Sequence, residues 1–228
     1  TLLAELNEAR TAKRRVCLVR YLESGGEALI VDGEVRLGTV PAEVAEAAAD
    51  ALRRDQSRTV DTGQGRAFLQ VFNPPLRLLV IGAVHIAQAL APMAALAGYQ
   101  VTVIDPRRAF STDSRFPDVA MTQDWPDEAM AALAPDRRTA VVALTHDPKL
   151  DDPGLDVALR SEAFYIAALG SRRTHGGRLE RLKEHGHDAA VLARIHGPAG
   201  LDIGAVSPAE IAISVLAEMT RALRVAAG

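Results

Sequence analysis

The chain has 228 residues, of which 48% are hydrophobic and 24% are charged, and its formal net charge at pH 7 is −3. This composition is typical of a globular protein with room for one large domain or two small ones. The small negative charge and the lack of a long apolar run exclude a global attraction to nucleic acid and a bilayer-spanning helix. We therefore expect neither nucleic acid nor a membrane as a partner.

The single cysteine and the first residues indicate a cytoplasmic protein. Cys17 has no second cysteine to pair with, and it lies in the apolar run 16–19. We expect it to be a buried strand residue rather than a nucleophile, because no neighbouring group would lower its pKa. The start, residues 1–5, lacks the pattern of a signal peptide. A reducing compartment fits both observations.

The first 73 residues predict a small α+β domain. Gly25-Gly26 joins two of its strands, and Asp32-Gly33 is typical of a hairpin turn. The helices are expected over 2–14 and 41–54, and the strands over 16–22, 27–31, 34–37 and 67–72. Asn73-Pro74-Pro75 suits a linker, because two prolines can neither continue a helix nor join a sheet ladder. We therefore expect one domain over residues 1–73 and a second over 76–228.

Strands and helices alternate from Leu76 onward, which predicts an α/β, Rossmann-like fold with a parallel sheet covered by helices on both faces. The strands are expected over 78–81, 101–104, 119–122, 140–144 and 165–169. The helix after the first strand carries an apolar stripe of Ile86, Leu90, Met93 and Ala97. The last helix should begin at Ser207, with Pro208 at its first position and Glu210 closing a capping box.

The turn after the first strand matches a dinucleotide-binding motif except at one position. Such a turn has the pattern G-x-G-x-x-G or A. Gly82 occupies the first position and Ala87 the last, but Val84 occupies the middle one. Since the backbone must approach a pyrophosphate closely at that point, a β-branched side chain obstructs the phosphate. The turn therefore indicates the fold more clearly than it indicates the ligand.

A polar cluster follows the second strand. Asp105 stands about 20 residues after the glycine turn, where NAD-binding proteins bind the ribose hydroxyls. Arg107 and Arg108 could hold a terminal phosphate by paired hydrogen bonds. A solvated turn is the alternative interpretation of the same residues.

A second polar cluster follows the fourth strand. We expect Thr145, His146 and Asp147 to orient a ligand by hydrogen bonds. A metal is conceivable at such a strand end, but no compact set of ligands at a recognised spacing completes a site. Asp151 or Asp152 would instead cap the following helix, with Pro153 in its first turn.

The third cluster follows the fifth strand and is the best candidate anion site. A glycine allows a tight turn there, N–H groups point outward at a helix start, and two arginines add positive charge. The residues are Gly170, Ser171, Arg172 and Arg173. Gly176-Gly177 weakens the start of this helix, which suggests that the segment orders around a ligand. Alternatively, the basic helix start forms salt bridges with Asp151 or Asp152.

No catalytic or metal-binding motif is found in the sequence. There is no Ser-His-Asp order, nucleophile elbow or zinc motif, and the six histidines have no clear partner. His196, in the loop over 195–204, is more simply interpreted as a structural histidine.

Taken together, these segments resemble the XdhC/CoxI family, accessory factors for molybdenum hydroxylases such as xanthine dehydrogenase. The resemblance runs from about Leu76 to the C-terminus. The matching segments are 82–90, which includes His85, then 145–153, 165–175, 194–204 and the helix after Ser207. The order of these segments and their amino-acid sequences are much more specific than a glycine turn alone.

The resemblance implies a Rossmann-like C-terminal domain that holds molybdenum cofactor and delivers it to an apo molybdenum hydroxylase. That cofactor is a pterin that carries a phosphate, which suits an anion site. The implied role is a cofactor-binding chaperone rather than an enzyme. The cofactor-binding candidates are Gly82, His85, Asp105, Arg107, Thr145, His146, Asp147, Gly170, Ser171, Arg172 and Arg173. Two alternatives remain: an NAD(P)-dependent oxidoreductase, and a protein-binding scaffold whose front domain supports a homodimer.

The chain departs from the family pattern at two places. Val84 stands where the family usually has a second glycine. The front domain usually carries a glycine-rich segment with a cysteine, whereas the comparable stretch 37–43 has none. Sulfur handling by that cysteine is therefore not carried over to this chain.

Overall fold

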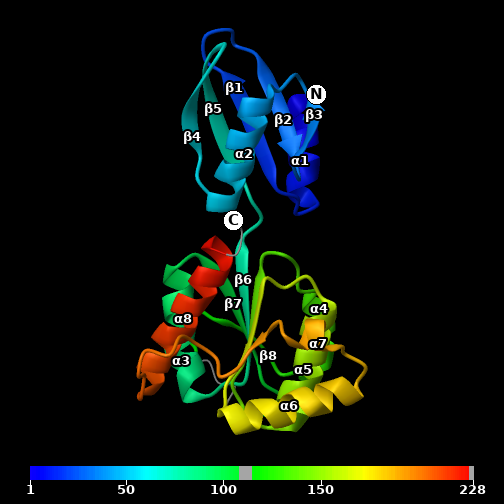
Figure 1. Cartoon of the computed structure of the whole chain (residues 1–228), viewed down its shortest axis with the longest axis vertical. Helices are drawn as coiled ribbons and strands as arrows, with labels where there is room; N and C mark the ends of the chain where they lie inside the picture. The colour runs from blue at the N-terminus through cyan, green and yellow to red at the C-terminus, as the bar shows by residue number, and fades with distance from the viewer. Residues whose placement is uncertain (108–114, 226–228) are drawn as a thin grey trace. The chain divides into compact units, whose positions relative to one another are not determined.

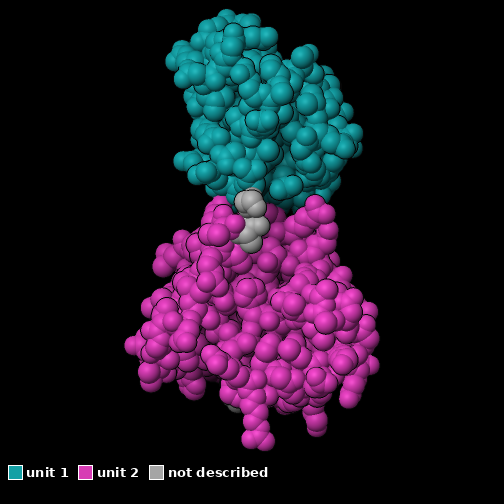
Figure 2. Space-filling view, viewed as in Figure 1, with its two compact units in different colours: residues 1–74 teal, residues 75–228 magenta. Residues whose placement is uncertain are grey.

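A computed structural model of the chain describes residues 1–107 and 115–225 (Figure 1). The chain divides into two compact units, Thr1–Pro74 and Pro75–Gly228 (Figure 2). Within the described ranges, no helix is long and apolar enough to cross a membrane.

The first unit is an antiparallel sheet with a helix on each face. Its strand order is β3-β2-β1-β5-β4. The strands are β1 Val16–Tyr21, β2 Glu27–Val31, β3 Glu34–Leu37, β4 Arg58–Thr62 and β5 Gly65–Phe72, and the helices are α1 Leu2–Thr11 and α2 Ala42–Arg54. Leu6 of α1 packs with Leu18 on one face, and Val44 of α2 packs with Val19 on the other. The central strand β1 is therefore apolar at successive positions, because both of its faces are covered.

Cys17 lies on β1 and is a free, fully buried thiol, as expected. Burial raises its pKa to about 11, so the thiol stays protonated at neutral pH. Strand β4 was not expected from the sequence. Its residues alternate between partly buried and exposed, as is typical of a strand at the edge of a sheet.

The second unit is a parallel six-stranded sheet in the order β11-β10-β9-β6-β7-β8. The strands are β6 Leu76–Ile81, β7 Tyr99–Ile104, β8 Ala120–Thr122, β9 Thr139–Ala143, β10 Tyr165–Ala168 and β11 Ile195–His196. Counted from β8, the strands follow the doubly wound order 3-2-1-4-5-6, in which successive strands are added on one side of β6 and then, from β9 onward, on its other side. The predicted α/β fold with a parallel sheet is confirmed.

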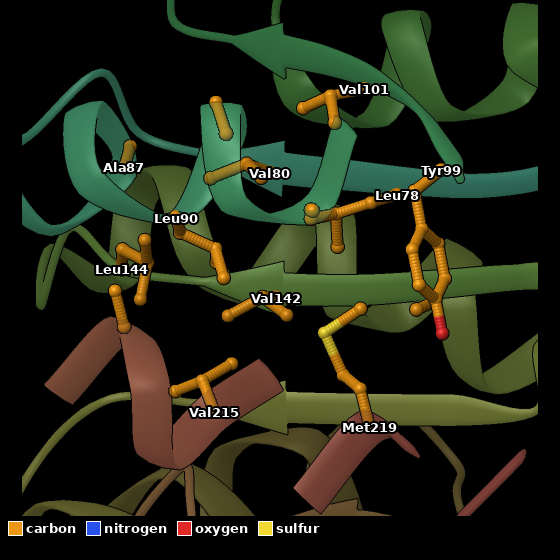
Figure 3. Close-up of a cluster of buried hydrophobic side chains, with 14 of the residues drawn as sticks. Leu78, Val80, Ala87, Leu90, Tyr99, Val101, Val142, Leu144, Val215 and Met219 are labelled. Carbon is orange, nitrogen blue, oxygen red and sulfur yellow. The ribbon is translucent and has the colours of Figure 1, made fainter. Parts of the chain in front are cut away.

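Helices cover both faces of this sheet (Figure 1). They are α3 His85–Leu96, α4 Pro126–Leu133, α5 Pro148–Arg160, α6 Arg172–Glu184, α7 Ala189–Leu192 and α8 Pro208–Arg224. On one face, Leu90 of α3 and Val215 and Met219 of α8 gather against strand residues such as Val142 (Figure 3). On the other face, α4 to α7 pack against the opposite side of the same strands.

The helix boundaries confirm one prediction and correct another. Ser207 accepts a hydrogen bond from Glu210 N, and the Glu210 side chain accepts one from Ser207 N, so α8 begins with the predicted capping box. Helix α3, in contrast, ends at Leu96. Ala97, expected on its apolar stripe, is exposed at the end of the helix, and the chain turns at Gly98 with a φ of 90°. The short elements α7 and β11 were not expected.

Candidate functional site

The predicted polar clusters follow the carboxyl ends of neighbouring parallel strands. Gly82 follows β6, Asp105 follows β7, Thr145 lies just after β9, and Gly170 lies just after β10. Two of these loops meet at the crevice where the strand order reverses, since a side chain at Gly82 would overlap Thr145 Cγ2. The loops after β9 and β10 also lie side by side, because a Cβ placed on Gly170 would be 3.8 Å from His146 Nδ1.

The β6–α3 turn requires glycine at its first position. Gly82 has a φ of 106°, which an L side chain rarely adopts, and its N–H donates to Ile104 O at 2.8 Å. Val84 is the N-cap residue of α3 and packs partly against the apolar cluster on that face of the sheet. His85 follows as an exposed residue at the first helical position.

Asp105 is fully buried and its carboxylate is engaged by the protein itself. Oδ2 accepts from Ala83 N at 2.8 Å and from Arg107 Nη2 at 2.8 Å, and Oδ1 accepts from Arg107 Nε at 2.9 Å. Burial alone would raise its pKa, but the hydrogen bonds from Arg107 and Ala83 hold the pKa below its usual value. Asp105 therefore joins the glycine turn to the end of β7. Arg108 lies outside the described residues.

Asp105→Asn is expected to destabilise the second unit by about 1–3 kcal/mol at neutral pH, since it removes a buried charged acceptor. The lowered pKa fixes the sign of the pH dependence. Stability from Asp105 is present above the pKa of an unfolded aspartate, about 4, and is lost as the pH falls through the folded value. The gap between wild type and variant should therefore narrow below about pH 4.

Urea unfolding followed by fluorescence of Trp125, the one tryptophan in the chain, reports on the second unit. Asp202→Asn, in an exposed loop, is a control for the loss of one carboxylate. A constant gap from about pH 3 to about pH 7 would contradict this role of Asp105.

The loop after β9 is organised around Asp151, which is 1% exposed. Asp151 Oδ1 accepts from Thr145 Oγ1 at 2.6 Å, and Oδ2 accepts from His146 N at 3.0 Å. Burial raises the pKa of the Asp151 carboxyl, while the bonds from Thr145 and the charge of Arg178 oppose that shift. His146 itself is exposed and has a φ of 63°.

The start of α5 differs from the expectation. Asp147 is the N-cap residue and accepts from Lys149 N at 3.0 Å, with Pro148 at the first helical position. The predicted cap at Asp151 or Asp152 was therefore wrong, because both residues lie inside the helix. Pro153 is likewise inside α5 rather than at its start.

Helix α6 begins where the anion site was predicted. Ser171 is its N-cap and accepts from Thr174 N at 3.1 Å. Arg172 and Arg173 are exposed in the first turn. The helix runs unbroken through Gly176-Gly177, so these glycines do not interrupt it.

The arginines that reach the aspartates of α5 lie one and two turns further along α6 than expected. Arg181 Nε and Nη2 contact Asp152 at 2.5 and 3.2 Å. Arg178 Nη2 lies 3.7 Å from Asp151 Oδ2 and donates to Leu169 O at 3.0 Å. The alternative of salt bridges from α6 to these aspartates is thus present, but through different arginines than Arg172 and Arg173.

A hollow of about 220 Å³ lies between α5 and α6, beside the loop after β9. It is called the α5–α6 hollow below. Its lining residues are His146, Pro148, Asp151, Asp152, Arg173, Thr174, Gly177, Arg178 and Arg181. Two of the predicted residues, His146 and Arg173, therefore face one shared space.

His196 has structural contacts. Its Nδ1 lies 3.2 Å from Glu218 Oε1, and its ring contacts that of Tyr165 in a tilted arrangement with the centroids 4.8 Å apart. Tyr165 and Gly200 donate to the other Glu218 oxygen at 2.7 and 3.0 Å. Over residues 1–107 and 115–225, no group of three or more His, Cys, Asp or Glu is arranged to hold a metal.

The second unit matches one protein family over most of its length, since residues 78–219 fit the XdhC Rossmann domain. The chain belongs to the XdhC family. The match covers all the strand ends described above, and it confirms the resemblance drawn from the sequence. The second unit is called the XdhC domain from here on.

Known proteins similar to this XdhC chain include the molybdenum cofactor insertion chaperone PaoD of Escherichia coli (strain K12). The two are 35% identical over 148 residues, which is 65% of this chain and 40% of PaoD. A Bacillus subtilis (strain 168) protein, named as a probable xanthine dehydrogenase subunit, is 32% identical over 178 residues, 75% of this chain and 52% of that protein. The chain thus spans about half or less of these relatives.

A solved structure supports the fold of both units. The crystal structure of a xanthine dehydrogenase from Bacillus halodurans matches 98% of this chain with a TM-score of 0.69 and 25% identity, and the match covers 64% of that protein.

Sequence reasoning found Arg173 but missed Arg178 and Arg181, the other two arginines that line the hollow of the XdhC domain. Arg178 and Arg181 lie on one face of α6 with Thr174 and Gly177, at helical spacings of three and four residues. This helical spacing of residues beyond the basic helix start was the sequence signal that could have identified them. The opposing aspartates on α5 could be paired with them only through the crossing of the two helices.

Proposed function

We propose that this chain is an accessory protein that binds molybdenum cofactor and delivers it to a molybdenum hydroxylase such as xanthine dehydrogenase. The observation that carries the proposal is the XdhC domain itself, together with its 35% identity to a protein named as a molybdenum cofactor insertion chaperone. The absence of a catalytic triad or elbow from the sequence supports a binding role rather than an enzyme.

The residues present fit a phosphate-bearing pterin at the carboxyl edge of the sheet. A buried guanidinium, Arg178, has donor atoms without a partner in the described chain, and it stands beside the start of α6. Such a charge next to a helix N-terminus suits the phosphate of the cofactor. His146, Asp147 and Ser171 would then orient the rest of the molecule from the neighbouring loops.

NAD(P) binding by an oxidoreductase is the second candidate, because the strand order of the XdhC domain is that of dinucleotide-binding sheets. Two residues weigh against it. The carboxylate of Asp105 is held by Arg107 and Ala83 rather than turned to solvent, and Val84 stands at the middle position of the turn. Saturable binding of NADH or NADPH in a fluorescence titration would favour this candidate over the first.

The proposed function is tested by loading and transfer. The full chain is incubated with molybdenum cofactor, passed through gel filtration, and assayed for molybdenum by mass spectrometry and for pterin by fluorescence after oxidation. The loaded protein is then mixed with apo xanthine dehydrogenase. We expect co-eluting cofactor and recovery of xanthine oxidation. A folded chain that binds no form of the pterin would contradict the proposal.

Three further properties belong to this proposal. The apo hydroxylase is the expected partner, and a cytoplasmic location is supported by the buried, free Cys17. Homodimerisation through the first unit stays a prediction, which sedimentation of the purified chain would test.

A further inference from the structure

A buried arginine lines the α5–α6 hollow with two donor atoms unsatisfied. The Arg178 side chain is 2% exposed, and its Nη2 is directed at Leu169 O and Asp151. Its Nε and Nη1 are buried and have no hydrogen-bond partner among the residues that the structure describes. Arginine stays protonated in proteins, and a buried charged donor without an acceptor opposes folding. An acceptor is therefore expected in the hollow.

The carboxylates in the wall of the hollow are already engaged by other donors. Arg181 holds Asp152 through two contacts, and Thr145 and His146 donate to Asp151. Arg173, a third arginine of the lining, is exposed in the first turn of α6. The lining contains three arginines against two aspartates. The net charge left over is positive, which favours an anion.

The position and size of the hollow limit the kinds of anion that can bind in it. Thr174 and Gly177 place it along the first turns of α6, where the N-terminal end of the helix adds positive potential. The volume of about 220 Å³ accommodates a tetrahedral oxyanion with room for its attachment to a larger molecule. A charged guanidinium donor forms a stronger hydrogen bond to a phosphoryl oxygen than a neutral donor does.

We propose that the α5–α6 hollow is a phosphoryl-binding subsite, in which the Arg178 guanidinium donates to a phosphate oxygen and Arg173 supplies further charge. The inference rests on the proposed function only for the identity of the molecule that carries the phosphate, which would be the pterin cofactor. Binding of inorganic phosphate and pyrophosphate by the hollow requires no cofactor and is tested by itself.

The adjacent glycines of α6 offer a matched pair of variants. Neither has a positive φ, and both lie inside the same helix, so replacement by leucine raises helix propensity equally. A side chain at Gly177 would grow into the hollow, with its Cβ 3.6 Å from Arg181 Nη1, whereas one at Gly176 meets nothing within 4 Å. Gly177→Leu therefore fills the hollow, and Gly176→Leu leaves it open.

Calorimetric titration of the full chain with phosphate and pyrophosphate, against sodium chloride at matched ionic strength, provides the test. We expect saturable binding by the wild type and by Gly176→Leu. Binding should weaken at least about tenfold in Gly177→Leu and in Arg178→Met, through loss of charged hydrogen bonds. Trp125 fluorescence checks that each variant is folded, and Gly177→Leu keeps the test valid if Arg178→Met does not fold.

The outcomes separate this subsite from the proposed function. No saturable phosphate binding by the wild type, or equal binding by the two glycine variants, overturns the subsite even if cofactor transfer succeeds. Phosphate binding that is lost only on filling the hollow supports the subsite even if the chain delivers no cofactor. In that second case the proposed function fails while the subsite stands.

Discussion

Gly82→Ala is expected to lower the free energy of unfolding of the XdhC domain by roughly 2–5 kcal/mol, one of the two largest effects predicted for the chain. Two costs add at this position. The φ of 106° lies in a region that an alanine adopts only with strain. The new Cβ would also overlap Thr145 Cγ2, across the crevice between β6 and β9. The chain has little freedom to move there, because Gly82 N is bonded to Ile104 O.

Two further variants separate these costs. Gly98→Ala has a similar φ of 90° but meets nothing within 4 Å, so it should show the backbone cost alone, about 1–2 kcal/mol. Thr145→Ser removes the overlapping methyl and keeps the hydroxyl that donates to Asp151. Combined with Gly82→Ala, it should recover the steric part of the loss.

Urea unfolding followed by Trp125 fluorescence measures all of these variants in the same unit of the chain. If Gly82→Ala costs no more than Gly98→Ala, the close approach of Gly82 to Thr145 contributes nothing to the loss of stability. The requirement for glycine would then come from the backbone conformation alone.

The contrast between α8 and α5 shows which features the sequence could predict. The capping box of Ser207 and Glu210 uses atoms within one helical turn, so the local sequence was enough to place the start of α8. The sequence from residue 147 to 153 contains two similar signals for a helix start, Asp147-Pro148 and Asp152-Pro153. Only the first starts the helix, because the later aspartates bind other partners. Asp152 pairs with Arg181 of α6, and Asp151 accepts from Thr145 in the preceding loop.

In the predicted site, too, features set by the local sequence could be predicted and features set by tertiary contacts could not. The strand ends could be predicted, because apolar runs such as 78–81 and 140–144 mark buried strands, and their polar successors must lie at one edge of a parallel sheet. Arg178 could not be recognised as a buried arginine with two unpartnered donor atoms, since that property depends on how α6 packs against α5. Similarly, the engagement of Asp105 by Arg107 converts an expected ribose ligand into a bond within the protein.

Asp151→Ala is the second variant with a large expected effect, a loss of roughly 3–5 kcal/mol in the stability of the XdhC domain. Both oxygens of this buried carboxylate face donors. Without it, Thr145 Oγ1 and His146 N lose their acceptor, and Arg178 loses the negative charge 3.7 Å away. Removing one partner of such a buried set costs more than the set contributed, because the other groups remain desolvated.

A matched control lies four residues earlier, at the start of the same helix. Asp147→Ala removes an exposed N-cap and should cost about 1 kcal/mol. The double variant Asp151→Ala/Arg178→Met removes both charges, so its loss should be clearly smaller than the sum of the two single losses. Equal effects for Asp151→Ala and Asp147→Ala would contradict a buried, coupled pair. Asp151 and Arg178 both line the α5–α6 hollow. The coupling between them therefore also measures how far Asp151 already neutralises the Arg178 charge to which we propose that a phosphoryl group binds.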